Sequence, residues 1–181
     1  MRPTRVECYT IVLCCMAFAL AVETRMQAQS SSEASIMDKH FVSEALKGGM
    51  AEVELGQLAQ EKASSEDVKA FGKKMVEDHS RLGDQMKEVA TQVGVKPPSS
   101  PTIMEQMEIK KLKGLDGAQF EQEYIKAMVK DHEGDLKDFK NEAANGKSAV
   151  VKEAANHGVD VVSGHLTMIQ AIARAHNITV N

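Results

Sequence analysis

The chain has 181 residues, 43% apolar and 27% charged, which is long enough and apolar enough for one ordinary domain with a packed core. The net charge is −4, and beyond residue 21 the chain has 20 basic and 25 acidic residues. This balance, without any basic patch, argues against nucleic acid as a partner. Aromatic residues make up only 4% and Trp is absent, whereas Ala, Lys, Glu, Gln and Met are plentiful. Such a composition favours helices over strands.

The first 21 residues have the pattern of a secretory signal peptide. Two arginines precede an uncharged, mostly apolar run over residues 9–22, and small residues follow at spacings that suit cleavage near Ala21 or, as the alternative, near Ala28. The run is short for a membrane span, although an uncleaved N-terminal anchor remains the competing interpretation. We therefore expect export to the periplasm or cell envelope, with no stable membrane span after cleavage. Residues 22–36 are predicted to be a flexible leader.

All three cysteines, Cys8, Cys14 and Cys15, fall within this predicted signal. The mature chain would therefore contain no cysteine. Disulfides, thiolate metal ligands and a cysteine nucleophile are excluded from it. An exported domain without disulfides must derive its stability from its packed core.

Four long segments of the mature chain have helical periodicity and plausible capping residues. A shorter amphipathic segment, 102–113, begins with Thr102 and Glu105 in a capping-box pattern. Ser35 and Asp38 form a similar pair before the first helix, and Ser64 with Asp67 is a candidate cap for the second. The four long helices are predicted at 38–62, 65–93, 116–145 and 148–176.

The connections between these helices differ greatly in length. Those between the first and second helices and between the third and fourth are a few residues long, which predicts antiparallel neighbours. The connection from Gly94 to Leu115 is long enough to return along the whole bundle, as in a ferritin-like fold. The alternative is that segment 102–113 only covers one end of an up-down bundle. The predicted fold class is all-α, a ferritin-like four-helix bundle over residues 37–177 with a short extra helix in the long link between helices two and three.

A repeated motif links the second and third long helices. Residues 71–79, with Phe71, Met75 and His79, align with residues 124–132 at an offset of 53 (79 to 132). Each copy places an aromatic residue, a methionine and a histidine four residues apart, on one face of a helix. Each histidine also follows an aspartate, which points about 100° away and could reach only a neighbouring helix.

The apolar stripe of each long helix is interrupted near its middle by one ionisable residue. In a bundle of helices of similar length, mid-helix residues meet at one level. A buried polar group without a partner costs roughly 1–3 kcal/mol, so these side chains must satisfy one another or bind something. The predicted layer consists of Glu52, His79, His132 and His165.

Three neutral imidazoles and a carboxylate are suitable ligands for iron, zinc or copper, so these four residues are candidate metal ligands. Met75 and Met128 lie one turn before two of the histidines and would join the set if the metal were copper. The competing interpretation is a hydrogen-bonded histidine–glutamate cluster with methionines as packing residues. A different rotation of the helices would instead expose one or two of the histidines.

The chain resembles a bacterial family of exported proteins with a ferritin-like domain, known as domain of unknown function 4142. The resemblance extends from about residue 37 to residue 175 and implies a ferritin-like bundle in the periplasm or envelope, with no established reaction. It rests on Phe41, the segments 49–59 and 68–71, the paired Met-Val-x-Asp-His motifs, segment 120–124 and His165-Leu166.

Working di-iron ferritins carry a glutamate three residues before each ligand histidine. This chain has Val76 and Val129 there, so ferroxidase activity and iron storage do not carry over.

Three functions follow from these patterns. The first is a non-enzymatic envelope protein whose core binds a metal or small ligand. The second is a metal-dependent redox enzyme, which needs an open coordination position and a path for substrate. The third is a structural or interaction module with a closed polar core.

Overall fold

The computed structural model describes residues 33–180 and shows that part of the chain to be all-helical, with no strand. The predicted signal peptide, and the predicted leader up to residue 32, lie outside the described residues. From Ala34 onward the chain forms one compact unit. None of the described helices is both long and apolar enough to cross a membrane.

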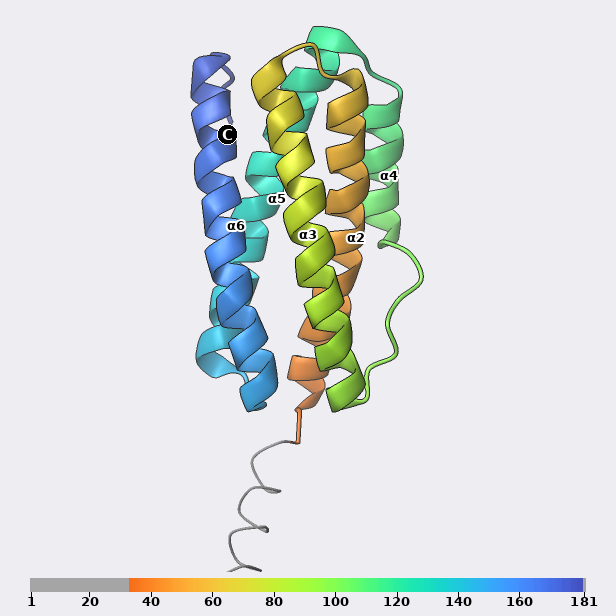
Figure 1. The fold of residues 1–181 in the computed structure, drawn as a ribbon, viewed down its shortest axis with the longest axis vertical. Helices are drawn as coiled ribbons and strands as arrows, with labels where there is room; N and C mark the ends of the chain where they lie inside the picture. Colours follow the sequence, from red (N-terminus) through yellow and green to blue (C-terminus); the bar gives the residue numbers. More distant parts are fainter. Residues whose placement is uncertain (1–32, 181) are drawn as a thin grey trace, which may run out of the picture. The chain divides into compact units, whose positions relative to one another are not determined.

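Five helices make up this unit, four of them long and one short (Figure 1). Their bounds agree with the predicted segments to within about two residues. They are α2 (Ile36–Lys62), α3 (Glu66–Val93), α4 (Ile103–Lys113), α5 (Gly117–Asn145) and α6 (Ala149–Ala175).

Local capping explains most of these boundaries. Ser35 and Asp38 form the predicted capping box at the start of α2, and Thr102 and Glu105 form the one at α4. The predicted cap by Ser64 is wrong, because Ser65 occupies the N-cap of α3 and no side chain there accepts a capping bond. The backbone N–H groups of Ser64 and Ser65 donate instead to Glu121 on α5. Gly94 ends α3 with φ 73°, a left-handed conformation that glycine adopts without strain.

The long helices surround a common core, and each packs against two neighbours. α2 packs on α3, α3 on α6, α6 on α5 and α5 on α2. Figure 1 shows that α2 and α6 run in one direction and that α3 and α5 run in the other, so every neighbouring pair is antiparallel. The connection after α3 therefore returns along the length of the helices, and α4 packs beside α2 and α5. The alternative in which segment 102–113 covers one end is wrong.

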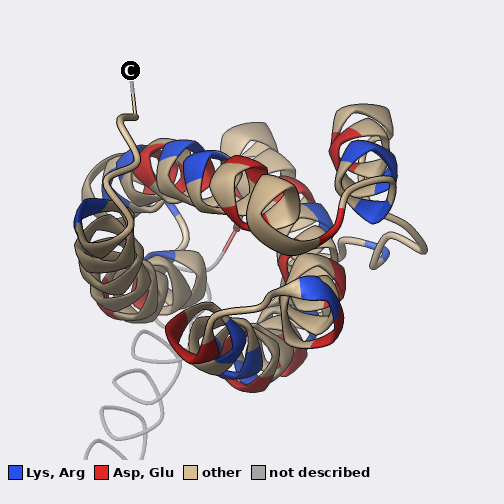
Figure 2. Cartoon of the chain, turned by 90° about the horizontal axis from the view of Figure 1, so that it is seen from above, with Lys and Arg blue, Asp and Glu red and all other residues tan. Residues whose placement is uncertain are grey.

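Two glycines allow close helix packing. A Cβ on Gly72 of α3 would lie 2.7 Å from the backbone oxygen of Gly56 on α2, so only glycine fits at this crossing. A Cβ on Gly158 of α6 would overlap the ring of Phe139 on α5. Viewed from above, the helices form a ring with α4 outside it, and residues of both charge signs occur along them (Figure 2).

The apolar core is divided into two clusters along the helix axes. One cluster contains Leu55, Phe71, Met75, Tyr124 and Ile169, among others. The second contains Leu46, Leu82, Met86, Phe139 and Val162, among others. In each long helix the sequence passes from one cluster to the other near its middle. The polar residues of the candidate site occupy this transition.

Candidate functional site

The structure brings together the four ionisable residues that interrupt the apolar stripes. Glu52 comes from α2, His79 from α3, His132 from α5 and His165 from α6, and each is at most 3% exposed. The three imidazole centroids are 5.0 to 5.8 Å apart. Since each residue lies near the middle of its helix, the antiparallel arrangement places all four at one level. They form a polar layer between the two apolar clusters.

One nitrogen of each imidazole lies within hydrogen-bonding distance of an oxygen, which belongs to Asp78, to the backbone of Met128 or, within the layer itself, to Glu52. His165 Nε2 lies 2.8 Å from the Asp78 carboxylate, and His132 Nδ1 lies 2.9 Å from the backbone carbonyl of Met128. His79 Nδ1 lies 2.8 Å from Glu52 Oε2. An oxygen partner of this kind fixes the ring orientation and determines which nitrogen faces inward.

The remaining nitrogens are His79 Nε2, His132 Nε2 and His165 Nδ1. His79 Nε2 and His165 Nδ1 are 3.1 Å apart. One nitrogen from each of the three rings lies within 4.8 Å of one from each of the others, which is close enough for a single ion to contact all three. The three rings therefore offer nitrogen atoms close enough together to hold one ion, and an oxygen atom lies beside the other nitrogen of each ring.

Two buried atoms of the layer have no hydrogen-bond partner among the described residues. They are Glu52 Oε1 and His132 Nε2, and they face each other across 3.5 Å. Because His132 Nδ1 donates to a carbonyl, its Nε2 carries a lone pair. Two lone pairs at this separation repel each other, and a cation between them would satisfy both.

Burial controls the protonation of the layer. It raises the pKa of Glu52 to about 8, and it lowers the pKa of His79 to about 4 and that of His132 to about 3. The metal-free layer at neutral pH therefore contains neutral imidazoles and a protonated glutamate. Neutral imidazole is the form that binds metals.

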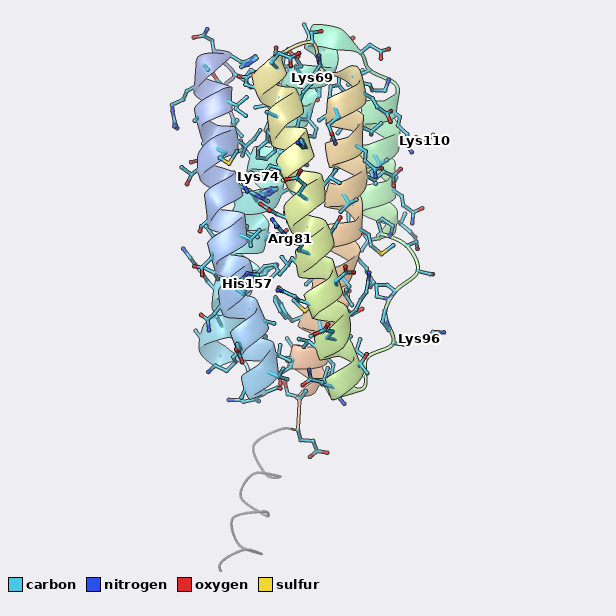
Figure 3. The ribbon with its side chains drawn as sticks, viewed as in Figure 1. Lys69, Lys74, Arg81, Lys96, Lys110 and His157 are labelled. Carbon is cyan, nitrogen blue, oxygen red and sulfur yellow. The ribbon has the colours of Figure 1, made fainter. Side chains whose placement is uncertain are left out.

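Asp78 connects the layer to the surface between α3 and α6. Partial burial acts to raise its pKa, but hydrogen bonds from Lys74, His165 and Arg81 hold that pKa well below its ordinary value. Figure 3 shows the side chains of Lys74 and Arg81 at mid-height of α3, toward α6. Asp78 is thus a fixed negative charge that orients His165. Sequence analysis indicated that Asp78 would reach a neighbouring helix, but not which histidine it would meet.

The methionines predicted as copper ligands lie in the apolar core. Met75 and Met128 are 0% and 1% exposed, and both belong to the apolar cluster that contains Phe71 and Tyr124. Met128 also contributes its backbone carbonyl to His132. Their role as sulfur ligands stays a prediction.

Sequence analysis did not place two carboxylates of α5 in the site: it noted Asp131 only as a residue that could reach a neighbouring helix, and it missed Asp135. Oxygens or nitrogens of Glu52, Asp131 and His132 lie within 4.8 Å of one another. Asp135 lines a cavity of about 10 Å³ together with Glu52 and His79, a volume that holds about one water molecule. The i, i+4 spacing of the two aspartates was the available signal, because it places both on one helix face.

Two surface grooves reach this level of the molecule. One lies between α4 and α5 and is lined by Asp131 and Asp135, among others. The other lies beneath Pro97 and Pro98 of the long link and is lined by His79 and Gly83, among others. The layer is therefore buried, but it is not remote from solvent.

The observations define an all-helical protein with a buried layer of three histidines and a glutamate. The profile of the family described as Domain of unknown function (DUF4142) matches residues 23–172, and the chain belongs to this family. A search of the curated proteins found no match.

Two solved structures have a similar fold at low sequence identity. A DUF305 fragment from Deinococcus radiodurans is 15% identical and has a TM-score of 0.70, covering 79% of this chain and 99% of its own. A DUF305 protein from Streptomyces coelicolor, described as a secreted protein, is 18% identical and has a TM-score of 0.68. It covers 80% of this chain and 95% of its own.

Proposed function

We propose that this chain is an exported, non-enzymatic protein of the periplasm or cell envelope, whose ferritin-like four-helix bundle binds one transition-metal ion. His79, His132 and His165 supply the nitrogen ligands, and Glu52 supplies a carboxylate. The predicted signal peptide and a structural neighbour described as secreted support the export. The antiparallel ring of helices and the long link after α3 support the ferritin-like connectivity.

One observation carries the metal proposal. Each imidazole has one nitrogen within hydrogen-bonding distance of an oxygen, and the three rings are close enough for their other nitrogens to serve one ion. A histidine cluster that served packing alone would not need three rings oriented in this way. In metal sites the same pattern is common, since the outer oxygen fixes the ring and strengthens the ligand.

The donor set limits the identity of the ion. Neutral imidazoles with a carboxylate suit zinc, iron and copper, and they disfavour calcium and magnesium, which prefer all-oxygen ligands. Copper would be favoured further if Met75 or Met128 turned its sulfur toward the layer. Zn²⁺ and Co²⁺ are suitable probes, because Co²⁺ commonly adopts zinc geometry and absorbs visible light.

The test combines elemental analysis of the protein purified from its native envelope with Co²⁺ titration of the metal-free protein. We expect close to one ion per chain, and loss of that ion in His79→Ala and His132→Ala. The matched control is His157→Ala, which removes an exposed histidine of α6 (Figure 3) and should bind the ion normally. Circular dichroism of each variant checks that the helices still form.

A native protein without metal, together with a metal-free protein that does not bind Co²⁺, would overturn the proposal. The layer would then be a closed hydrogen-bonded cluster with a structural or interaction role. The continuous contacts from Asp78 through His165 and His79 to Glu52 favour this second candidate. A redox enzyme would also need substrate to reach the ion, and the cavity beside Glu52 and His79 is the place where it would have to enter.

A further inference from the structure

The groove between α4 and α5 is acidic where it meets the buried layer. Its lining contains three lysines and six acidic residues, so its net charge is −3 when every carboxyl group is ionised. Burial and the neighbouring carboxylates, including that of Glu52, raise the pKa of Asp131 to about 8 and that of Asp135 to about 9, because carboxyl groups this close together favour a bound proton or cation. Lys111 pairs with Glu108 and Glu123, and Lys126 also approaches Glu123. Among residues 33–180, no lysine or arginine pairs with the remaining aspartates of the groove, which are Asp131, Asp135 and Asp138.

Two of these aspartates connect the groove with the interior. Asp131 is 41% exposed on the groove side, and one of its carboxylate oxygens lies within 4.8 Å of Glu52 and His132 ligand atoms. Asp135 lines both the groove and the small inner cavity that touches Glu52 and His79. A cation that entered the groove would meet these two carboxylates before it met any imidazole.

Glu52 supplies an independent sign of a ligand at this place. Its side chain is almost completely buried, and Oε1 has no hydrogen-bond partner among the described residues unless it shares a proton with Asp131. This oxygen lies on the side of the layer that faces His132 and Asp131. Glu52 therefore offers one oxygen that both the groove carboxylates and the imidazoles can share.

We infer that Asp131 and Asp135, with Glu52 Oε1, form a loading position at which a divalent cation from the α4–α5 groove is held before it reaches the three imidazoles. The inference rests on the proposed metal site. A hydrated divalent ion can exchange a water ligand for an exposed carboxylate oxygen. The imidazoles lie behind these carboxylates, in the core. Negative charge at the mouth of a cleft also raises the local cation concentration and the association rate.

The second groove lacks these features. It contains Asp84, but this carboxylate pairs with Lys87 at 2.8 Å. No other acidic residue lines that groove, so its charge is balanced. A cation would be attracted to the first groove and not to the second.

The experiment is a stopped-flow measurement of Co²⁺ uptake by the metal-free protein, with the double variant Asp131→Asn/Asp135→Asn. We expect the association rate to fall about tenfold at low salt, with the final stoichiometry unchanged. Sodium chloride should lower the association rate of the wild type, and it should reduce the difference in rate between the wild type and the double variant. The matched control, Asp84→Asn, removes a carboxylate of the other groove and should load at the wild-type rate.

The outcomes separate the two proposals. If the wild type takes up no ion, the metal proposal fails and the loading position fails with it. If the wild type takes up Co²⁺ and the double variant takes it up equally fast, only the loading position is refuted. The same conclusion follows if Asp84→Asn is the variant with the lower rate of uptake. A purely structural role for the aspartates predicts a lower melting temperature of the metal-free double variant. A loading role predicts an equal or higher one, because the folded variant no longer has to hold two crowded carboxyl groups whose ionisation is unfavourable.

Discussion

A buried pair of carboxyl groups at the turn between α5 and α6 should make the stability of this protein depend on pH. Asp38 of α2 is fully buried and accepts backbone N–H bonds from Lys147 and Ser148. Glu142 of α5 is 6% exposed, and its buried Oε1 has no hydrogen-bond partner among residues 33–180 unless it shares a proton with Asp38. Burial and the Asp38 carboxylate raise the pKa of Glu142 from 4.5 to about 7.

Proton linkage determines whether the free energy of unfolding rises or falls with pH. Below pH 4.5 Glu142 is protonated in both the folded and the unfolded chain, and its stabilising contribution is fully present. As pH rises toward 7 the unfolded chain loses this proton first, so the free energy of unfolding falls until the folded protein has released it too. A rise in pKa from 4.5 to about 7 corresponds to roughly 3 kcal/mol. Because local relaxation and water penetration reduce the cost of a second buried charge, we expect a loss of about 1–2 kcal/mol.

The variant Glu142→Gln tests this reasoning, because an amide can donate to Asp38 but cannot lose a proton. Urea denaturation followed by circular dichroism should show the variant to be more stable than the wild type by about 1–2 kcal/mol at pH 8, with little difference at pH 4. Glu153→Gln, an exposed change on α6, is the control and should show no such pH dependence. The shared proton would be refuted if the variant were less stable than the wild type at pH 8. It would also be refuted if the free energy of unfolding changed by the same amount at pH 4 and pH 8.

Two further substitutions, the second with a matched control, test the metal site and the packing. Asp78→Asn should weaken metal binding by about 10–100-fold, measured by competition with a chelator, because His165 loses the carboxylate that orients it; unchanged affinity would show that this contact is irrelevant to binding. Gly158→Ala should destabilise the protein by about 1–3 kcal/mol in urea, since the new methyl group overlaps Phe139. Gly164→Ala in the same helix places its methyl group in open space and should stabilise the protein by about 0.5–1 kcal/mol. A similar change in stability for both variants would contradict the close packing of Gly158 against Phe139.

The helices and the level of the polar layer could be predicted because they depend on local information. Apolar periodicity identifies the buried face, and capping residues fix the ends to within about two residues. One ionisable residue in each stripe is enough to predict a layer when the helices are similar in length. The predicted cap at Ser64 was wrong because Glu121, from a distant helix, binds the N–H groups at that turn.

The surroundings of the layer could not be predicted because they depend on which helices become neighbours. The repeated Asp-His motif shows this clearly. Asp78 contacts His165 because α3 packs on α6, whereas Asp131 faces the groove because α4 lies beside α5. Two copies of one motif thus have different partners, because different helices pack beside α3 and α5.

The hydrogen-bond chain also predicts how many protons leave when a metal binds. In the metal-free layer His165 Nε2–H donates to Asp78, so His165 Nδ1 must accept from His79 Nε2–H. His79 Nδ1 is then an acceptor, and the 2.8 Å contact requires that Glu52 Oε2 carry a proton. An ion bound to His79 Nε2 displaces that proton, and His79 Nδ1 takes the proton of Glu52 in its place. Binding should therefore release one proton per ion.

Isothermal titration calorimetry at pH 7, in buffers of different ionisation enthalpy, measures this number directly. In Glu52→Gln the amide has no acid proton to transfer, so His79 can only move its own proton from Nε2 to Nδ1. This variant should bind the ion more weakly and release no proton. Release of a proton by Glu52→Gln, or of none by the wild type, would contradict the assigned hydrogen-bond directions. Because loss of affinity alone does not change the proton count, the measurement separates the role of Glu52 in proton transfer from its role as a ligand.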